Sequence, residues 1–339
     1  MARESIAVKY RPQNLNEVIG QKSIIKVLEK QVQQNQLKNC YLWAGPSGCG
    51  KTTIARCFAK LINEGYGQPE ELDAASENGV DNIRVIIDQA NERAIEGKYK
   101  IFIIDECHMI TTAGWNAFLK TLEEPPLYTI FMFCTTDPQK IPATVLNRLM
   151  RFNLTKLSFN AIMERLEYVC RFESFVYEKE ALEYIAKLSN GCMRQALADL
   201  EKVSDFGSIN VTNALECLGT FSYEFCFKIT NAIIDGNEAE LLGCISELYD
   251  SGYDLKYFID YFLSFILDLG KYTIFNNLNL IKIPPMYEEQ IKYVVGIENA
   301  KSYYMYLVDK ILDLKVLLKN ETKIKDVIEI WFLKLARGV

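Results

Sequence analysis

Gly45-Pro46-Ser47-Gly48-Cys49-Gly50-Lys51-Thr52 is the stretch that decides the fold of this chain. It fits the phosphate-binding pattern G-x-x-x-x-G-K-[ST]. An apolar run at 40–44 precedes it, and a helix-like segment at 53–61 follows it. The pattern therefore lies in the strand, loop and helix context that phosphate binding by this motif requires.

The chemistry of a phosphate group explains this spacing. Glycines let the backbone turn its N–H groups inward, and the following helix adds the positive end of its dipole. Lys51 is expected to neutralise the β- and γ-phosphates of a nucleotide, and Thr52 to bind Mg²⁺ through its hydroxyl. The nucleotide-binding residues predicted in this segment are Gly45, Pro46, Ser47, Gly48, Cys49, Gly50, Lys51, Thr52 and Thr53.

Two carboxylates end the apolar run at 101–104. Such a run is typical of a buried parallel strand, which delivers its last side chains to the carboxyl edge of a sheet. Asp105 is placed to bind a water molecule of the Mg²⁺ shell, and Glu106 to orient or deprotonate an attacking water. The pair predicts a centre that hydrolyses the bound nucleotide.

Strand and helix patterns alternate up to about residue 155, which predicts an α/β fold with a parallel sheet covered on both faces. The segment 7–20 is expected to be an extended strap, because Pro12 forces Arg11 away from the helical region. Only helical patterns follow residue 158, so we predict domains at 1–155, 156–220 and 221–339. The expected strands are 40–44, 72–76, 101–106 and 129–134, and the expected helices of the first domain are 23–36, 53–61, 83–94, 113–123 and 143–149.

Composition excludes several classes of protein. The chain has 339 residues, 49% of them hydrophobic, and a net charge of −6, so it is a folded protein and not a generally basic nucleic-acid coat. Its ten cysteines include no C-x-x-C pair, which favours reduced thiols in a cytosolic protein over disulfides or zinc. The N-terminus has no signal-peptide pattern, and no apolar run is long enough to span a membrane.

Further motifs along nearly the whole chain resemble those of the AAA+ ATPase subunits of DNA polymerase clamp loaders. This family includes the bacterial DNA polymerase III gamma/tau subunit, the replication factor C small subunits and phage equivalents. The narrowest matches are Leu-Lys-Thr-Leu-Glu-Glu-Pro-Pro at 119–126 and Thr-Thr-Asp-Pro-Gln-Lys-Ile-Pro at 135–142. The others lie at 8–12, 18–21, 73–76, 105–109 and 191–197.

The resemblance implies an architecture and a set of partners. The fold would be a P-loop AAA+ parallel-sheet domain, a small helical lid and an all-α C-terminal collar that assembles subunits. The activity would be an ATPase using ATP and Mg²⁺ to open a sliding clamp and load it on primer-template DNA. The partners would be the clamp, that DNA and other loader subunits in a ring or spiral, expected as a pentamer, in the cytoplasm of a bacterial or phage-infected cell.

The resemblance also implies roles for single residues. Thr136 matches the sensor 1 residue near the γ-phosphate, and Arg194 matches the sensor 2 arginine that reaches the phosphates from the lid. Arg148 matches the arginine finger that acts on ATP held by a neighbouring subunit. The adenine pocket would be formed by Tyr10, Arg11, Pro12, Val18 and Ile19.

Two features depart from the family pattern. The family's Ser-Arg-Cys triplet is replaced by Asn147-Arg148-Leu149, so Arg151 is a possible substitute for the finger. The cysteine zinc module of bacterial gamma/tau subunits has no counterpart, because only residues 63–71 lie there and none is a cysteine. We therefore expect no structural zinc, and a compact form more similar to a phage or shortened version, without a tau-like tail.

Several polar and basic residues of the first domain could contact DNA. The plausible DNA contacts are Asn78, Gly79, Arg84, Arg93, Lys98 and Lys100.

Asp105-Glu106-Cys107-His108 also resembles the D-E-x-H box of helicases, but no second arginine-rich helicase motif accompanies it. Two other functions stay open: a different AAA+ DNA motor, such as a Holliday-junction branch-migration helicase, and an assembly subunit that binds ATP without hydrolysing it.

Overall fold

The structure is a computed structural model that describes residues 4–219 and 221–338. It divides into two compact units. The first unit runs to Tyr177 and includes Ile185–Asp205, and the second contains Glu178–Tyr184 and the residues from Phe206 onward. Residue 220, where one predicted domain boundary falls, lies outside the described residues. The division into three domains stays a prediction.

The first unit contains a five-stranded sheet in the order β2-β3-β4-β1-β5, and all neighbouring strands are parallel. The strands are β1 Cys40–Ala44, β2 Glu70–Asp73, β3 Lys100–Asp105, β4 Thr129–Thr135 and β5 Met150–Asn153. Ala44 is paired with Thr135, and Ile104 with Phe133. The carboxyl ends of β1, β3 and β4 therefore meet at one edge of the sheet, where ligands of such folds bind.

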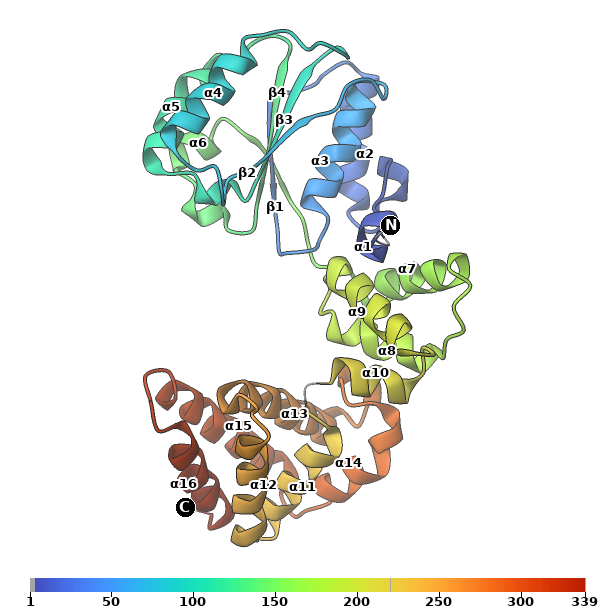
Figure 1. Ribbon diagram of the computed structural model, residues 1–339, viewed down its shortest axis with the longest axis vertical. Coiled ribbons are helices and arrows are strands. Elements are labelled where there is room, and N and C mark those ends of the chain that lie inside the picture. Colours follow the sequence, from blue (N-terminus) through green and yellow to red (C-terminus); the bar gives the residue numbers. More distant parts are fainter. Residues whose placement is uncertain (1–3, 220, 339) are drawn as a thin grey trace. The chain divides into compact units, whose positions relative to one another are not determined.

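Alternation along the buried strands creates two hydrophobic cores, one on each face of the sheet. Ile101 and Ile103 of β3 point to one face, and Phe102 and Ile104 to the other. The first face is covered by α2 Lys22–Gln33 and α3 Lys51–Ile62. The second face is covered by α4 Val80–Ala90, α5 Thr112–Glu123 and α6 Ala143–Leu146 (Figure 1). The predicted α/β fold with both faces covered is confirmed.

Five local predictions were wrong. The helix expected at 83–94 is α4 Val80–Ala90, which begins one turn earlier and ends at its cap residue Asn91, so Ala94 lies outside it. The expected strap contains α1 Ile6–Lys9 and the 3-10 turn η1 Leu15–Glu17, because Pro12 restricts Arg11 but leaves 6–9 free to form one helical turn. The short strand β5 was missed. The strand β2 begins and ends before its expected bounds, at 70–73 instead of 72–76. The helix α6 ends at Leu146, because the chain must turn there to enter β5.

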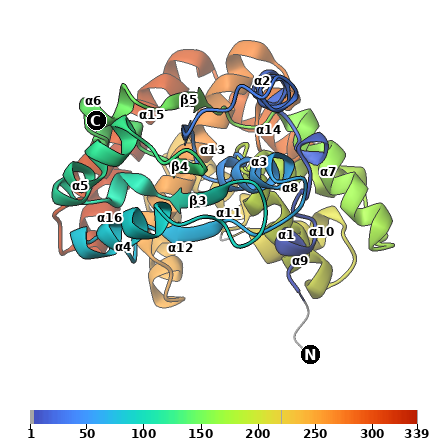
Figure 2. The ribbon, with the colours of Figure 1, turned by 90° about the horizontal axis from the view of Figure 1, so that it is seen from above.

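Helices α7 Phe159–Phe172, α8 Lys179–Leu188 and α9 Met193–Phe206 follow the sheet, and two short turns, η2 Cys107–Met109 and η3 Pro138–Lys140, lie at its edge. Figures 1 and 2 show α1 close to α9. The Tyr10 hydroxyl donates to Glu173 Oε1 at 2.8 Å, and the Ile6 N–H donates to Glu201 Oε1 of α9 at 3.1 Å. The N-terminal segment is therefore tied to two helices that are far away in sequence.

The described part of the second unit is built from helices and short 3-10 turns, with no strand. Its core contains the rings of Phe258, Phe262 and Phe332, and Tyr304 is fully buried. Its elements are α10 Val211–Leu218, α11 Tyr223–Ile234, α12 Glu238–Asp250, α13 Leu255–Phe275, α14 Glu288–Val295, α15 Ala300–Leu317 and α16 Ile324–Ala336, with η4 Leu278–Leu280 and η5 Pro285–Tyr287. Among the described residues, no helix combines the length and the apolar character needed to cross a bilayer.

Candidate functional site

The loop between β1 and α3 has the backbone of a phosphate cradle. Gly48 has φ +68° and Gly50 has φ +101°, a region that residues with a side chain rarely adopt. A Cβ atom on Gly48 would lie 2.0 Å from Cys192 Sγ, so this position also has no room for a side chain. The loop leads directly into α3, whose N-terminus adds its positive dipole end. A nucleotide polyphosphate fits these donors.

Lys51 and Thr52 are held next to the loop and the acidic strand end. Lys51 is only 6% exposed, and its Nζ donates to the Gly45 and Pro46 carbonyls at 3.0 and 3.1 Å. Thr52 Oγ1 donates to Asp105 Oδ2 at 2.7 Å. A hydroxyl and a carboxylate in contact supply the hard oxygen atoms that Mg²⁺ prefers. A P-loop fold of this kind binds nucleotide with Mg²⁺, and these residues fit both groups.

Glu106 follows Asp105 in a left-handed backbone conformation, with φ +44°. Its Oε2 accepts hydrogen bonds from Thr136 N at 3.2 Å and Thr136 Oγ1 at 2.9 Å. His108 Nδ1 lies 3.2 Å from the same oxygen atom and 3.1 Å from Thr135 Oγ1. The structure thus brings the predicted general base and the predicted sensor 1 residue into direct contact.

Two buried cysteines lie beside these acids. Burial raises the pKa of the Cys107 and Cys134 thiols well above the ordinary value, and the neighbouring carboxylates raise it further. Both thiols therefore stay neutral and act as small core residues, not as nucleophiles.

The helix α9 begins against the phosphate loop. Met193 N donates to the Gly48 carbonyl at 3.2 Å, and Cys192 lies against Gly48. Arg194 is exposed on the first turn of this helix. The Cys192 contact was not predicted, because no local pattern links residues that are 144 positions apart.

The predicted adenine-pocket residues are spread along the N-terminal segment. The Tyr10 ring meets Tyr168 of α7 edge-on, and Pro12 O accepts from Cys57 Sγ of α3 at 3.3 Å. Val18 packs against the core on the α2 and α3 face. Arg11 and Ile19 are half-buried between these points. The segment thus links α7 to the helix that follows the phosphate loop, and a shared adenine contact stays a prediction.

The two arginines predicted to act on a neighbour lie at the surface of the first unit. Arg148 follows α6, and its side chain is 31% exposed. Its guanidinium donates to the Glu123 carboxylate and to the Thr144 carbonyl. Arg151 is exposed on β5, where its Nε donates to Asn153 Oδ1 at 2.8 Å. Neither arginine is enclosed in the core.

The predicted DNA-facing residues do not form one patch. Asn78 and Gly79 follow β2 at the carboxyl edge of the sheet, whereas Lys98 and Lys100 lie at the start of β3, at the opposite edge. Lys100 Nζ is bound by the Gln89 carbonyl at 2.9 Å and lies near two carboxylates. The remaining two have local contacts: Arg84 is paired with Asp81, and Arg93 lies over the Tyr128 ring.

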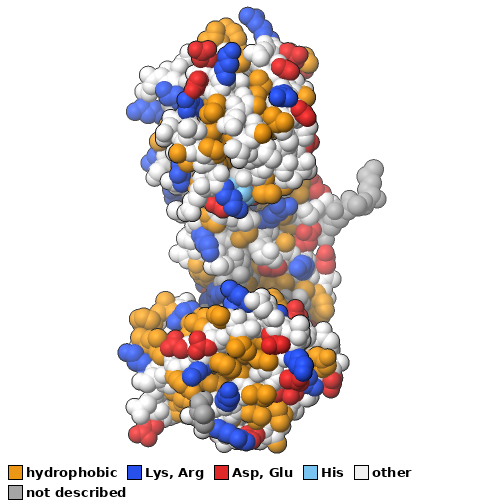
Figure 3. Space-filling view, turned by 90° about the vertical axis from the view of Figure 1, so that its left-hand side faces the viewer, with side chains coloured by type: hydrophobic (Ala, Val, Ile, Leu, Met, Phe, Trp, Pro, Cys, Tyr) orange, Lys and Arg blue, Asp and Glu red, His pale blue; other side chains and the backbone are white. Residues whose placement is uncertain are grey.

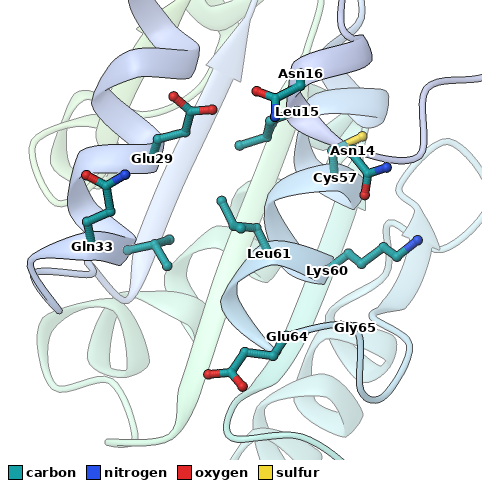
Figure 4. A pocket seen from close by; sticks show the side chains of 11 residues that line it. Asn14, Leu15, Asn16, Glu29, Gln33, Cys57, Lys60, Leu61, Glu64 and Gly65 are labelled. Atoms are coloured by element: carbon teal, nitrogen blue, oxygen red, sulfur yellow. The ribbon is translucent and has the colours of Figure 1, made fainter.

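A cavity of about 500 Å³ lies away from this site, between α2, η1 and the C-terminal half of α3. Figure 4 shows Glu29 and Gln33 on one wall and Lys60, Leu61 and Glu64 on the other. No lining residue belongs to the predicted nucleotide site. Within 4–219 and 221–338, no cluster of three or more His, Cys, Asp or Glu side chains is arranged to hold a metal.

Two family profiles match parts of the chain. The profile described as DNA polymerase III, delta subunit, matches residues 67–158, and the Rad17 P-loop domain matches residues 3–105. Together they cover the sheet and the N-terminal segment.

Curated proteins match over longer stretches. DNA polymerase III subunit gamma/tau of Mycoplasma genitalium is 32% identical, over 89% of this chain and 54% of that protein. The chain thus spans about half the length of this relative. DNA polymerase III subunit gamma of Buchnera aphidicola is 31% identical, and the match covers 92% of both chains. The solved Holliday junction branch migration motor RuvB of Thermotoga maritima has a TM-score of 0.54 and 23% identity, over 67% of this chain and 80% of that one, which shows the fold alone.

Proposed function

This chain belongs to the DNA polymerase III gamma/tau subunit family, and from that membership we propose that it is an ATPase subunit of a sliding-clamp loader. Its partners would be the clamp, primer-template DNA and further loader subunits in a ring or spiral, with a pentamer as the expected assembly. Bound ATP·Mg²⁺ supplies an electrophilic γ-phosphate and the charge that holds subunits together. A cytoplasmic location and the absence of structural zinc belong to the same proposal.

The residues at the sheet edge divide the work of hydrolysis. Lys51 would neutralise the β- and γ-phosphates of bound ATP, while Thr52 and Asp105 would hold Mg²⁺, the latter through a water molecule. Glu106 orients the attacking water and accepts its proton, and Thr136 sets the direction of the Glu106 carboxylate by the two hydrogen bonds described above. The observation that carries the proposal is that Thr52 contacts Asp105, and Thr136 contacts Glu106, at the same edge of the sheet.

Arginines extend the site beyond one sheet. Arg194 on the first turn of α9 would bind phosphate and so make the position of this helix depend on the nucleotide. Arg148, or Arg151 in its place, would reach the nucleotide of a neighbouring subunit. Arg151 and Arg194 are exposed and Arg148 is partly exposed, which supports such a role. ATP would then stabilise a spiral that holds the clamp open, and hydrolysis would release it.

The test is the ATPase activity of the full chain and of Glu106→Gln, assayed with the partner subunits, the clamp and primed DNA. We expect clamp and primed DNA together to stimulate the wild-type activity, and Glu106→Gln to lower kcat about 100-fold or more, because the general base is lost. The exposed Glu77, at the same edge of the sheet, provides the control Glu77→Gln, which should retain full activity.

The same assay separates the competing functions. Equal, negligible hydrolysis by wild type and Glu106→Gln would identify an assembly subunit that only binds ATP. Stimulation by duplex DNA with strand movement, and without any effect of the clamp, would identify a different DNA motor.

A further inference from the structure

Arg148 is held within its own chain by a carboxylate that the proposed function does not use. Glu123 is the last residue of α5, and Arg148 follows α6, which packs against α5. One guanidinium nitrogen, Nη2, donates to Glu123 Oε1, and the other, Nη1, donates to the Thr144 carbonyl. The Glu123 side chain is 50% exposed, so the pair lies at the surface.

The other two candidate arginines, Arg151 and Arg194, are not held by a carboxylate among the described residues. Arg151 donates to the neutral Asn153 side chain, and no ion pair of Arg151 is found in the part of the chain that the structure describes. Arg194 likewise has no ion pair among the described residues. Of these three arginines, Arg148 is thus the one with a contacting carboxylate among the described residues.

We propose that Glu123 is a positioning residue that holds Arg148 in its own subunit and opposes the engagement of Arg148 with a nucleotide bound by the neighbour. This inference rests on the proposed function. A phosphate that approaches the guanidinium must also approach the Glu123 carboxylate, and the two anions repel each other. The carboxylate also cancels much of the field that Arg148 presents to the neighbour, so the pair must separate before Arg148 can bind phosphate.

The strength of the contact suits a gate that can open. Half-exposed ion pairs shift an equilibrium by only roughly 1.4-fold to fivefold. A nucleotide phosphate offers a higher charge and a charge-assisted bond to the guanidinium, so a well-formed neighbouring site can displace Glu123. A poorly aligned neighbouring site cannot displace Glu123 from Arg148. The pair would thus suppress hydrolysis in loosely assembled subunits.

The test compares Glu123→Gln with Glu124→Gln, because Glu124 is the adjacent exposed glutamate and has no ion pair among the described residues. The readout is the protein concentration that gives half-maximal ATPase activity. We expect Glu123→Gln to lower this concentration about twofold to fivefold, with an unchanged maximal rate per subunit and unchanged affinity of the chain's own site for a fluorescent ATP analogue. Added salt should reduce the difference, because it screens an exposed pair.

A third variant separates the inference from its premise. Arg148→Ala should abolish the concentration-dependent part of the activity; if it does not, both the trans role of Arg148 and the gate formed by Glu123 are overturned. If Arg148→Ala behaves as expected but Glu123→Gln matches Glu124→Gln, only the gate is overturned. A loss of activity in Glu123→Gln would mean that Glu123 supports Arg148 and does not restrain it, which also overturns the gate.

Discussion

Glu106 occupies a backbone conformation that L-residues with a side chain avoid, at a cost of about 1–2 kcal/mol. Such strain persists when the surroundings fix the residue, and here Glu106 N donates to Asp105 Oδ1 at 2.9 Å while Thr136 binds the carboxylate. The side chains of Asp105 and Glu106 consequently point in different directions directly after β3. One acid turns to Thr52 and the other to Thr136, so adjacent residues can serve different steps of one reaction.

Asp199 is a second residue in an unfavourable environment, because its carboxyl is buried. It lies in α9 with 6% of its surface exposed, and Gln195 Nε2 donates to its Oδ1 at 2.7 Å. Burial raises the pKa of this carboxyl above the usual value, although the Gln195 hydrogen bond and Lys202 lower it in part. Folding therefore makes the ionisation of this carboxyl less favourable than it is in the unfolded chain.

We predict that Asp199→Asn stabilises the protein at pH 7. A carboxyl whose pKa is raised by folding contributes stability below its unfolded pKa, and this contribution is lost as the pH rises through the folded pKa. Asparagine keeps the acceptor for Gln195 and carries no charge at any pH. Urea unfolding between pH 8 and the acid limit of folding should show a gap that closes as the pH falls. Glu180→Gln, on the exposed surface of α8, should show no such gap; equal stability of Asp199→Asn and wild type at pH 7 would refute the prediction.

At the scale of elements, the phosphate loop and the start of α9 fit together at a single glycine, Gly48. Gly48→Ala adds both the strain of a positive φ and a Cβ atom 2.0 Å from Cys192 Sγ. We expect a loss of about 2–5 kcal/mol in the free energy of unfolding, since left-handed strain costs about 1–2 kcal/mol and overpacking about 1–3 kcal/mol. Urea unfolding of the full chain measures it.

A double variant isolates the steric part of this effect. Cys192→Ala removes the sulfur atom, so Gly48→Ala with Cys192→Ala should be less destabilised than the sum of the single changes. Gly50 provides the matched control, because it also has a positive φ, but a Cβ atom there would meet no atom within 4 Å. Gly50→Ala should gain nothing from Cys192→Ala. If both glycine variants respond alike, the contact between Gly48 and Cys192 contributes nothing to stability.

Elements with strong local patterns were predictable, and those defined by partners were not. The strand β1 was predicted with its observed bounds because its five residues are all buried and apolar. The strand β5 is four residues long, alternates between half-buried and exposed side chains, and pairs only with β1 at the edge of the sheet. Nothing in Met150–Asn153 distinguishes it from a loop, because its hydrogen bonds depend on a strand about 110 positions earlier.

The candidate site shows the same division. The motifs predicted which residues gather at the sheet edge, because parallel strands deliver their last residues to one side. Two contacts were not predictable from the motifs. The contact of Thr136 with Glu106 depends on the order of the strands, and the contact of Glu123 with Arg148 depends on helix packing. The family resemblance assigned roles to the single residues but said nothing of these contacts.

At the scale of the whole molecule, the second unit has more apolar surface than its own core uses. The helix α15 buries Tyr304, Leu307 and Ile311 on one face, yet Met305, Leu312 and Val316 are exposed on another at intervals of seven and four residues. Figure 3 shows hydrophobic side chains gathered on the face of this unit that is turned to the viewer. A helix that is apolar on two faces is typical of a subunit interface.

If the second unit assembles through Met305, Leu312 and Val316, Val316→Glu should weaken assembly of the full chain about tenfold or more in the presence of ATP. Val316 is 68% exposed, so the change should leave the fold intact, but a carboxylate buried without a partner in an apolar interface is costly. Sedimentation equilibrium would measure the association, and circular dichroism the fold. Leu127→Glu introduces the same charge at an aliphatic residue that is 83% exposed in the first unit, and it should leave self-association unchanged. Equal effects of the two variants, or no effect of Val316→Glu, would show that α15 does not form the interface.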